Sequence, residues 1–189
     1  MRIFFCIITL LLALLLEQLI GNSGFSISIT AGVLLYIAGT AGIKAALWTA
    51  VLTGCCIDMN YARPEAFTAL ILPLAVGCGC YFMPEKEYRD QLYRSVFAGA
   101  AASGVFMLGN AAAVFLLYGK TGYPSGILAQ FATFMLTGIC GFPVLILFLD
   151  AIAQKLNLPV YLTKLPADIA KLEKPEIEIE TASGRRRKK

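Results

Sequence analysis

The chain has 189 residues, of which 58% are apolar and 15% are charged, and its formal net charge is +4 with no histidine. An average soluble domain carries about 25% charged residues, so this composition excludes an ordinary soluble protein and indicates an integral membrane protein. The absence of histidine removes the commonest general base and a common metal ligand, which counts against catalysis and against a metal site.

Apolar blocks, taken in chain order, predict the membrane spans. A spanning helix needs about 20 mainly apolar residues, and four blocks reach that length: residues 3–20, 66–83, 95–118 and 126–149. The region between the first two blocks is apolar apart from Lys44, and we interpret it as two short helices, residues 27–41 and 45–57. The expected fold is therefore an all-α integral membrane protein, a six-helix transmembrane bundle formed by residues 1–157.

The first block raises a separate question, because Met1 and Arg2 before an apolar run also begin many secretory signal peptides. No small-x-small cleavage site precedes Glu17 and Gln18. We therefore expect the block to stay in the protein as its first span.

Basic residues predict the orientation of the bundle. With six spans and a cytoplasmic N-terminus, all of the 16 basic residues except Arg63 and Lys120 face the cytoplasm. Cytoplasmic loops carry an excess of Lys and Arg, so both termini are expected in the cytoplasm. A five-span alternative, with residues 27–57 as one bent helix, places Lys86, Arg89 and Arg94 outside and fits this rule less well.

Residues 158–189 differ from the rest of the chain. They contain three prolines and end in five consecutive basic residues, Arg185 to Lys189. Such a segment cannot bury a core, so we expect a mobile cytoplasmic tail. Its basic end is predicted either to bind anionic lipid headgroups or simply to anchor the protein by the positive-inside rule, and nucleic acid is not an expected partner.

Small residues recur at every fourth position in two of the predicted helices. These rows are Ala46, Ala50 and Gly54 in one helix and Ser95, Gly99 and Ser103 in the other. Helices in lipid associate through close packing of such small residues, so both rows are predicted to be helix contacts. In the last span, Gly138, Gly141 and Pro143 predict a kink.

Asp58 continues the first row at the same spacing and is the main candidate site residue. A carboxylate at the edge of a bilayer is costly unless it reaches water or a partner. We expect Asp58 to point toward the protein interior or an outer crevice, with Arg63 as its nearest candidate partner. Two interpretations stay open, a functional or partner-contact residue and an ordinary interfacial helix end. Glu17, late in the first span, is expected near the same outer face.

The sequence contains no recognisable motif for catalysis, for cofactor binding or for metal binding. The six cysteines all lie in apolar segments, where cysteine acts as a small hydrophobe. Neither a nucleophile motif nor a glycine-rich phosphate loop occurs, and the cysteine spacings do not match a zinc site. We therefore expect a protein that is not an enzyme and holds no cofactor or metal.

The stretch from Gly54 to Asp58, which closes the third short segment, resembles the Gly-Leu-x-x-Asp signature of the rod-shape-determining MreD family. The order of parts is also similar, from the Met-Arg start to a last span that ends at Leu149 and Asp150. The resemblance covers residues 1–157. Two positions depart from the family pattern: Ser28 to Thr30 lack its proline, and Glu65-Ala66 stand where a glycine is usual.

Membership of that family implies a non-enzymatic subunit of the bacterial inner membrane. Such subunits belong to the cell-elongation complex, bind MreC, and help couple MreB to the transpeptidase and glycosyltransferase of peptidoglycan synthesis. The resemblance also implies a fold similar to the substrate-binding subunits of energy-coupling-factor transporters.

That similarity supplies the alternative function, a vitamin-binding transporter subunit. Such a subunit typically has an alanine-x-x-x-alanine motif in its first span, whereas residues 3–20 contain only Ala13. It also needs an outward-facing aromatic pocket. The candidate lining residues are Phe25, Trp48, Tyr61 and Tyr123.

Overall fold

The computed structural model describes residues 2–22, 28–60, 66–84, 92–118 and 124–162. Within these ranges the regular structure is helical and contains no strand, which confirms the all-α prediction. The helices are α1 (Arg2–Asn22), α2 (Ile29–Ala41), α3 (Ile43–Asn60), α4 (Phe67–Tyr81), α5 (Ser95–Tyr118), α6 (Pro124–Leu136) and α7 (Phe142–Lys155), with a short 3-10 helix, η2 (Leu92–Arg94), before α5.

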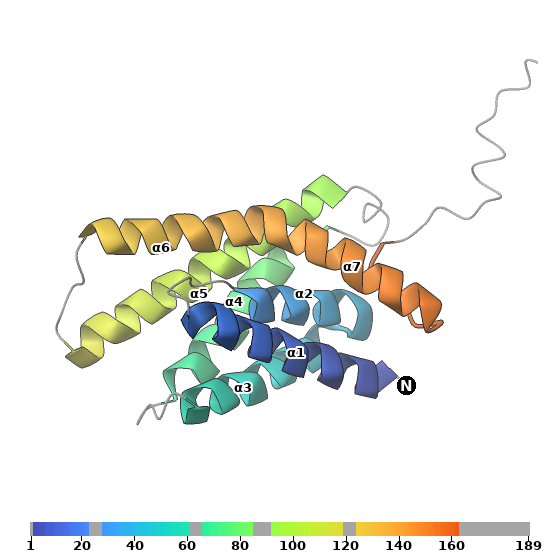
Figure 1. Ribbon diagram of the computed structural model, residues 1–189, viewed down its shortest axis with the longest axis horizontal. Helices are drawn as coiled ribbons and strands as arrows, with labels where there is room; N and C mark the ends of the chain where they lie inside the picture. The colour runs from blue at the N-terminus through green and yellow to red at the C-terminus, as the bar shows by residue number, and fades with distance from the viewer. Residues whose placement is uncertain (1, 23–27, 61–65, 85–91, 119–123, 163–189) are drawn as a thin grey trace, which may run out of the picture.

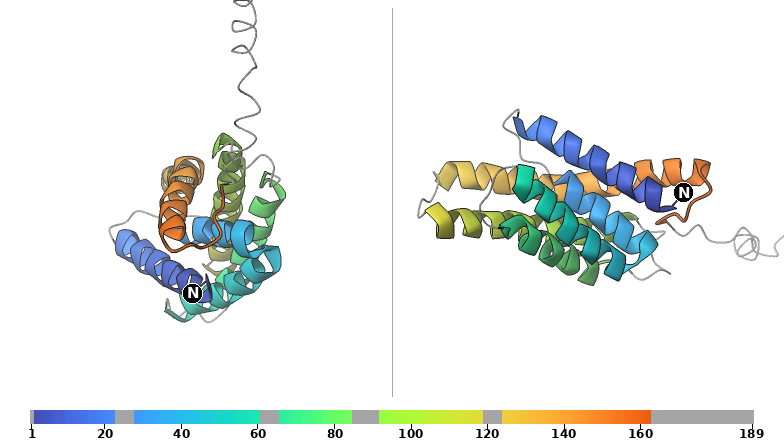
Figure 2. Two further views of the ribbon diagram at one scale, coloured as in Figure 1. Left: turned by 90° about the vertical axis from the view of Figure 1, so that its right-hand side faces the viewer. Right: turned by 90° about the horizontal axis from the view of Figure 1, so that it is seen from below.

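Successive helices run in alternating directions along the long axis of the bundle, with α6 and α7 forming one curved rod (Figures 1 and 2). We call the end where α1 begins the proximal end and the opposite end the distal end. The C-terminus of α7 also lies at the proximal end (Figure 1). The chain therefore enters and leaves the bundle on the same side.

Three helical segments are long and apolar enough to cross a membrane: Ile3–Ile20, Ser95–Ala113 and Leu128–Lys155. The predicted span 66–83 is shorter than expected, because α4 has 15 residues and ends at Tyr81, shortly before Pro84. At about 1.5 Å per residue that helix covers about 22 Å, against a hydrocarbon core of about 30 Å. Length and composition thus identify three crossing helices, and the six-span arrangement remains a proposal.

The predicted pair of short helices is confirmed, because α2 and α3 are separate helices joined at Gly42. The φ angle of Gly42 is 104°, a conformation that favours glycine, and its amide donates to the Ala38 carbonyl over 3.1 Å. Helix α3 spans Ile43–Asn60, longer than the predicted 45–57, so Lys44 lies in its first turn and is exposed.

Helix α2 forms the centre of the bundle. Every residue from Thr30 to Ala38 is buried, and α2 packs against α1, α3, α4, α5 and α7. A helix that is apolar on all sides belongs in the middle of a protein. The other helices are therefore arranged around α2, and most of their outward-facing side chains are apolar.

The α6–α7 rod contains a five-residue π-helical turn, η3 (Thr137–Gly141), directly before Pro143 in the first turn of α7. This irregularity falls where the two glycines and the proline predict a kink. A Cβ atom added to Gly138 would lie 2.5 Å from the Gly99 carbonyl oxygen. The row of Ser95, Gly99 and Ser103 is buried, as predicted, and at Gly99 it brings the backbone of α5 against this turn.

The boundary predicted at residue 157 is too early. After α7 the chain reverses at Asn157, whose φ angle is 53°, and Tyr161 is only 1% exposed. Residues 158–162 therefore belong to the packed bundle. Composition missed this because the nearby Pro159 resembles the start of a tail, whereas burial of Tyr161 depends on distant helices. The predicted tail from residue 163 onward lies outside the described residues.

Replacing Gly138 by Ala should lower the stability of the protein, because the new methyl group meets the α5 backbone at Gly99 as well as Ser103 Oγ. Overpacking of this kind costs about 1–3 kcal/mol. Gly77→Ala is the matched control, since the nearest atom to its added Cβ is Leu47 Cδ2 at 4.0 Å. Thermal unfolding in detergent should show a lower Tm for Gly138→Ala and an unchanged or higher Tm for Gly77→Ala. Equal Tm values for the two variants would contradict the close α5–η3 contact.

Candidate functional site

The described ranges contain three acids, Glu17, Asp58 and Asp150, and each accepts a hydrogen bond from a backbone amide farther along the chain. The bonded amides lie 13, 11 and 11 residues after their acids, so each bond closes a chain reversal. Such amides need acceptors wherever water is scarce, because an unpaired buried N–H group costs free energy. The three carboxylates form the most distinctive polar feature of the described structure.

Asp58 lies in the last turn of α3, two residues before its end, and is 4% exposed. Its Oδ2 accepts a hydrogen bond from the amide of Ala69, the third residue of α4, over 3.1 Å. Helix α4 begins after Ala66, which has no side-chain acceptor of its own. Asp58 therefore acts as the N-terminal cap of the next helix, where a carboxylate also interacts favourably with the helix dipole.

Gly54 explains how Asp58 comes so close to α4. A Cβ atom at Gly54 would lie 2.5 Å from Ala69 Cα and 2.7 Å from the Thr68 carbonyl oxygen. The glycine thus lets the backbones of α3 and α4 touch one turn before Asp58. Ala46 and Ala50 continue the contact face and are fully buried, which confirms the inward orientation predicted for this row.

Glu17 caps the N-terminus of α2, as Asp58 caps that of α4. Its Oε2 accepts a hydrogen bond from the amide of Thr30, the second residue of α2, over 2.9 Å. Ser28 occupies the N-cap position of α2 but its side chain makes no capping bond. The acid of the preceding helix therefore replaces the local cap. Glu17 and Asp58 therefore cap two different helices, α2 and α4.

Asp150 accepts three hydrogen bonds and is 2% exposed. Its Oδ1 accepts hydrogen bonds from the Tyr36 hydroxyl and the Tyr161 amide, each over 2.7 Å. Its Oδ2 accepts one from the Leu162 amide over 2.8 Å. The carboxylate therefore ties α7 to α2 and to the segment that follows α7. Sequence reasoning treated Asp150 only as the end of a span.

These contacts favour a structural over a reactive role for the acids. A general acid or base needs a lone pair or proton directed at a substrate, whereas these carboxylates are directed at backbone amides of the same chain. No group of three or more His, Cys, Asp or Glu side chains that could hold a metal occurs among the described residues. Arg63, the predicted partner of Asp58, lies outside the described residues.

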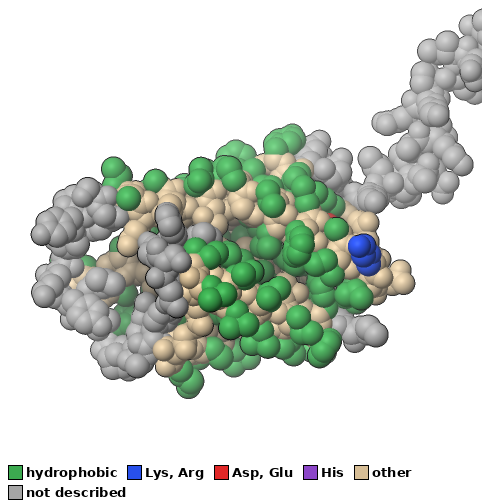
Figure 3. All heavy atoms as spheres, viewed as in Figure 1, with side chains coloured by type: hydrophobic (Ala, Val, Ile, Leu, Met, Phe, Trp, Pro, Cys, Tyr) green, Lys and Arg blue, Asp and Glu red, His purple; other side chains and the backbone are tan. Residues whose placement is uncertain are grey.

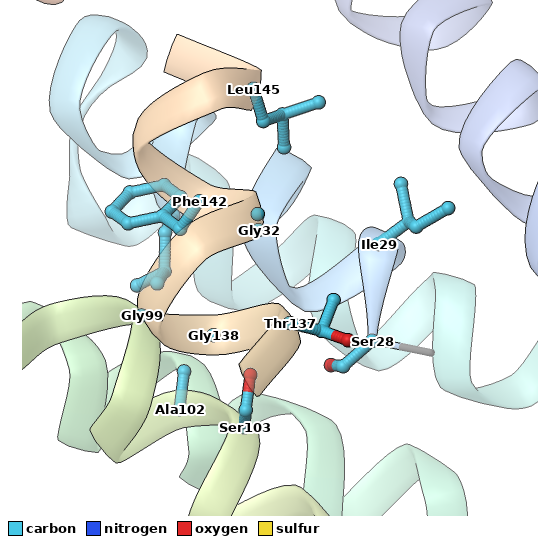
Figure 4. A pocket seen from close by; sticks show the side chains of 12 residues that line it. Ser28, Ile29, Gly32, Gly99, Ala102, Ser103, Thr137, Gly138, Phe142 and Leu145 are labelled. Carbon is cyan, nitrogen blue, oxygen red and sulfur yellow. The ribbon is translucent and has the colours of Figure 1, made fainter. Parts of the chain in front are cut away.

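A small cavity of about 50 Å³ lies between α2, α5 and the η3 turn. Figure 4 shows the hydroxyls of Ser28, Ser103 and Thr137 beside it. The Thr137 hydroxyl donates to the Thr133 carbonyl, while Ser28 Oγ is buried without a hydrogen-bond partner in the described part of the chain. The space suits a few water molecules, and it is far smaller than the roughly 300 Å³ at the lower limit of ligand pockets.

Trp48 does not line a pocket of the kind expected in a vitamin-binding subunit. It is 73% exposed on the outside of α3, and the other three aromatic residues suggested for that pocket lie outside the described residues. Trp48 is instead near the proximal end, as are Tyr81 and Tyr93, which are 85% and 64% exposed. Exposed Trp and Tyr residues are typical of a membrane–water interface.

The surface is apolar over the middle of the bundle. Figure 3 shows hydrophobic side chains across the visible face and a basic side chain toward the right-hand end, the proximal end of Figure 1. The exposed lysines Lys44 and Lys155 lie at the start of α3 and the end of α7, both proximal positions. This distribution fits a helix bundle whose sides contact lipid.

Replacing Asp58 by Ala should destabilise the protein, because the amide of Ala69 loses its acceptor. Loss of an N-terminal cap costs about 0.5–2 kcal/mol. Asp58→Asn, which keeps an oxygen acceptor, should cost less, and Asn60→Ala, at an exposed neighbouring position, should have little effect. Thermal unfolding of the purified protein checks this order. A Tm for Asp58→Ala equal to that of Asn60→Ala would refute the capping role.

The candidate site is thus a set of helix junctions closed by carboxylates, without a described reactive centre. No protein-family model, curated protein or solved structure matches the chain.

Proposed function

We propose that the chain is a non-enzymatic scaffold subunit of the bacterial inner membrane, with the cell-shape role implied by its resemblance to the MreD family. In this role it binds MreC within the cell-elongation complex and supports peptidoglycan synthesis through its partners. The observation that carries the proposal is the use of Gly54 and Asp58. These residues, on which the resemblance rests, hold the α3–α4 junction together.

The sequence signature from Gly54 to Asp58 holds two helices together, and this structural role suits a scaffold protein. Gly54 brings two backbones into contact, and Asp58 fixes the start of the next helix. Such a pair shapes the distal end of the protein without providing a reactive group. The buried position of Asp58 favours an indirect effect on a partner, because the side chain is directed into the bundle rather than toward the surface.

The transporter alternative receives less support. The cavity beside Ser28 has a volume of about 50 Å³, too small for a vitamin by the usual size of ligand pockets, about 300–1,000 Å³. Trp48, one of its suggested lining residues, is on the outside of the bundle. We therefore prefer the scaffold.

The proposed topology has six membrane-crossing segments, with α6 and α7 counted as one. Alternating helix directions support it, as does the position of the start of α1 and the end of α7 at the proximal end (Figures 1 and 2). Lys44 and Lys155 lie at that end with the exposed aromatic residues. By the positive-inside rule the proximal end is the cytoplasmic one. Short helices such as α2 can be accommodated because they are surrounded by protein rather than lipid.

Cysteine labelling tests this topology. In a variant whose six native cysteines are replaced by Ala or Ser, Asn60→Cys should react with a membrane-impermeant maleimide in spheroplasts. Tyr88→Cys should react only after the membrane is permeabilised, because it follows one further crossing. Reaction of both positions from the same side would exclude the six-span arrangement.

Depletion of the protein in its native bacterium tests the function. The scaffold proposal predicts that rods round up and that tagged protein isolates MreC from detergent-solubilised membranes. Restored expression of the wild type should recover both properties. Expression of Met59→Ala, a surface control whose side chain is 80% exposed, should recover them as well. Normal cell shape combined with loss of vitamin uptake would replace the scaffold with the transporter alternative.

A further inference from the structure

Tyr161 is packed like a bound ligand at the proximal end of the bundle. Its ring is stacked against Tyr36, with centroids 6.2 Å apart and planes at 26°, and meets Phe142 edge-on at 6.3 Å. Its hydroxyl is 3.3 Å from Ser95 Oγ. The ring is therefore held by three different helices, α2, α7 and α5.

The backbone beside this ring is also fixed, by hydrogen bonds to Asp150. The consecutive amides of Tyr161 and Leu162 donate to the two oxygens of Asp150. The Tyr36 hydroxyl donates to Oδ1 as well, which orients the carboxylate. A carboxylate that accepts hydrogen bonds from two successive amides, beside aromatic rings that contact a side chain, can recognise an extended peptide segment.

The segment reaches this position only through a reversal of the chain. Helix α7 ends at Lys155, Leu158 donates its amide to the Ala153 carbonyl over 2.9 Å, and Asn157 has a positive φ angle of 53°. Such a conformation is disfavoured for most residues, although Asn tolerates it better than others. The contacts made by Tyr161 and Asp150 offset this local cost.

The structure assigns a tyrosine-binding pocket to the proximal end, formed by Tyr36, Ser95, Phe142 and Asp150, with Tyr161 of the same chain as its ligand. The pocket recognises a phenol ring together with the backbone amides of its own residue and of the next residue. Its occupation clamps α2, α5 and α7 together and fixes the position of the chain at Tyr161 and Leu162. This inference is independent of the proposed cell-shape role.

Small-molecule rescue of the full-length protein tests the pocket. Tyr161→Ala should lower the Tm by about 5–10 °C, as expected for removal of a buried aromatic side chain. Tyr161→Phe keeps the ring and should lose less. Millimolar p-cresol, which is the tyrosine side chain as a free molecule, should raise the Tm of Tyr161→Ala in a saturable manner and leave the wild type unchanged.

Tyr81→Ala is the matched control, because Tyr81 is 85% exposed, and its Tm should match that of the wild type with and without p-cresol. An unchanged Tm for Tyr161→Ala would overturn the proposal. So would an equal effect of p-cresol on all variants, which indicates partition into detergent, or a lowered Tm without any response to p-cresol, which indicates packing without a binding pocket.

Fluorine NMR keeps the proposal testable if Tyr161→Ala does not fold. In full-length protein labelled with 3-fluorotyrosine, the Tyr161 signal, identified by its loss in Tyr161→Phe, should be shielded from a soluble gadolinium reagent while Tyr81 is accessible. Asp150→Asn should increase the gadolinium accessibility of Tyr161 and leave that of Tyr81 unchanged. A Tyr161 signal that is as accessible as Tyr81 in the wild type would refute the pocket.

Discussion

The structure depends on one constraint, the need of backbone amides for acceptors where water is scarce. The first amides of a helix have no partner within that helix. In a soluble protein water or a local cap satisfies them, but α2 begins at a serine that makes no capping bond and α4 begins after an alanine. Carboxylates of preceding helices fill both positions, and a third carboxylate serves the turn after α7.

This arrangement resolves a conflict between two costs. A carboxylate in an apolar environment is unfavourable, and so is an unpaired amide. Bringing the two together removes most of both penalties, and the positive end of the helix dipole adds to the attraction. Each such bond also fixes where the next segment begins in space, since it joins one helix to the start of that segment. The same residues therefore supply stability and topology.

Close backbone packing makes these bonds geometrically possible. Gly54 places α3 against the start of α4, and Gly99 with Gly138 brings α5 against the η3 turn. Little hydrophobic driving force acts between helices in lipid, so contacts of this kind and the polar junctions must hold the bundle together. The central helix α2 links the two sets of contacts.

Part of this organisation could be predicted from the sequence. The row of small residues from Ala46 predicted that Asp58 faces the protein interior or an outer crevice and not lipid, because helical periodicity fixes the face of a residue, and the side chain is buried. The break between α2 and α3 was predicted because Lys44 interrupts the apolar region. The capping bonds could not be predicted, since they depend on where the next helix begins in space.

Other features could not be predicted from the sequence, for related physical reasons. The shortened α4 was not evident from hydropathy alone, although Pro84 marks the limit beyond which the helix does not continue. Tyr161 was assigned to the tail because local composition there resembles a linker. Its burial follows from Asp150 and from Tyr36, which lies 114 residues before Asp150 in the chain. Contacts at such separation leave no local pattern.

Amide hydrogen exchange measured by NMR in lipid nanodiscs tests the central claim most directly. The amides of Thr30, Ala69 and Leu162 should exchange slowly in the wild type. Replacing Glu17, Asp58 or Asp150 by Ala should accelerate exchange at the amide bonded to that acid far more than at the other two. Exchange that is fast in the wild type, or unaffected by loss of the bonded acid, would contradict the account of carboxylates as the caps that hold this bundle together.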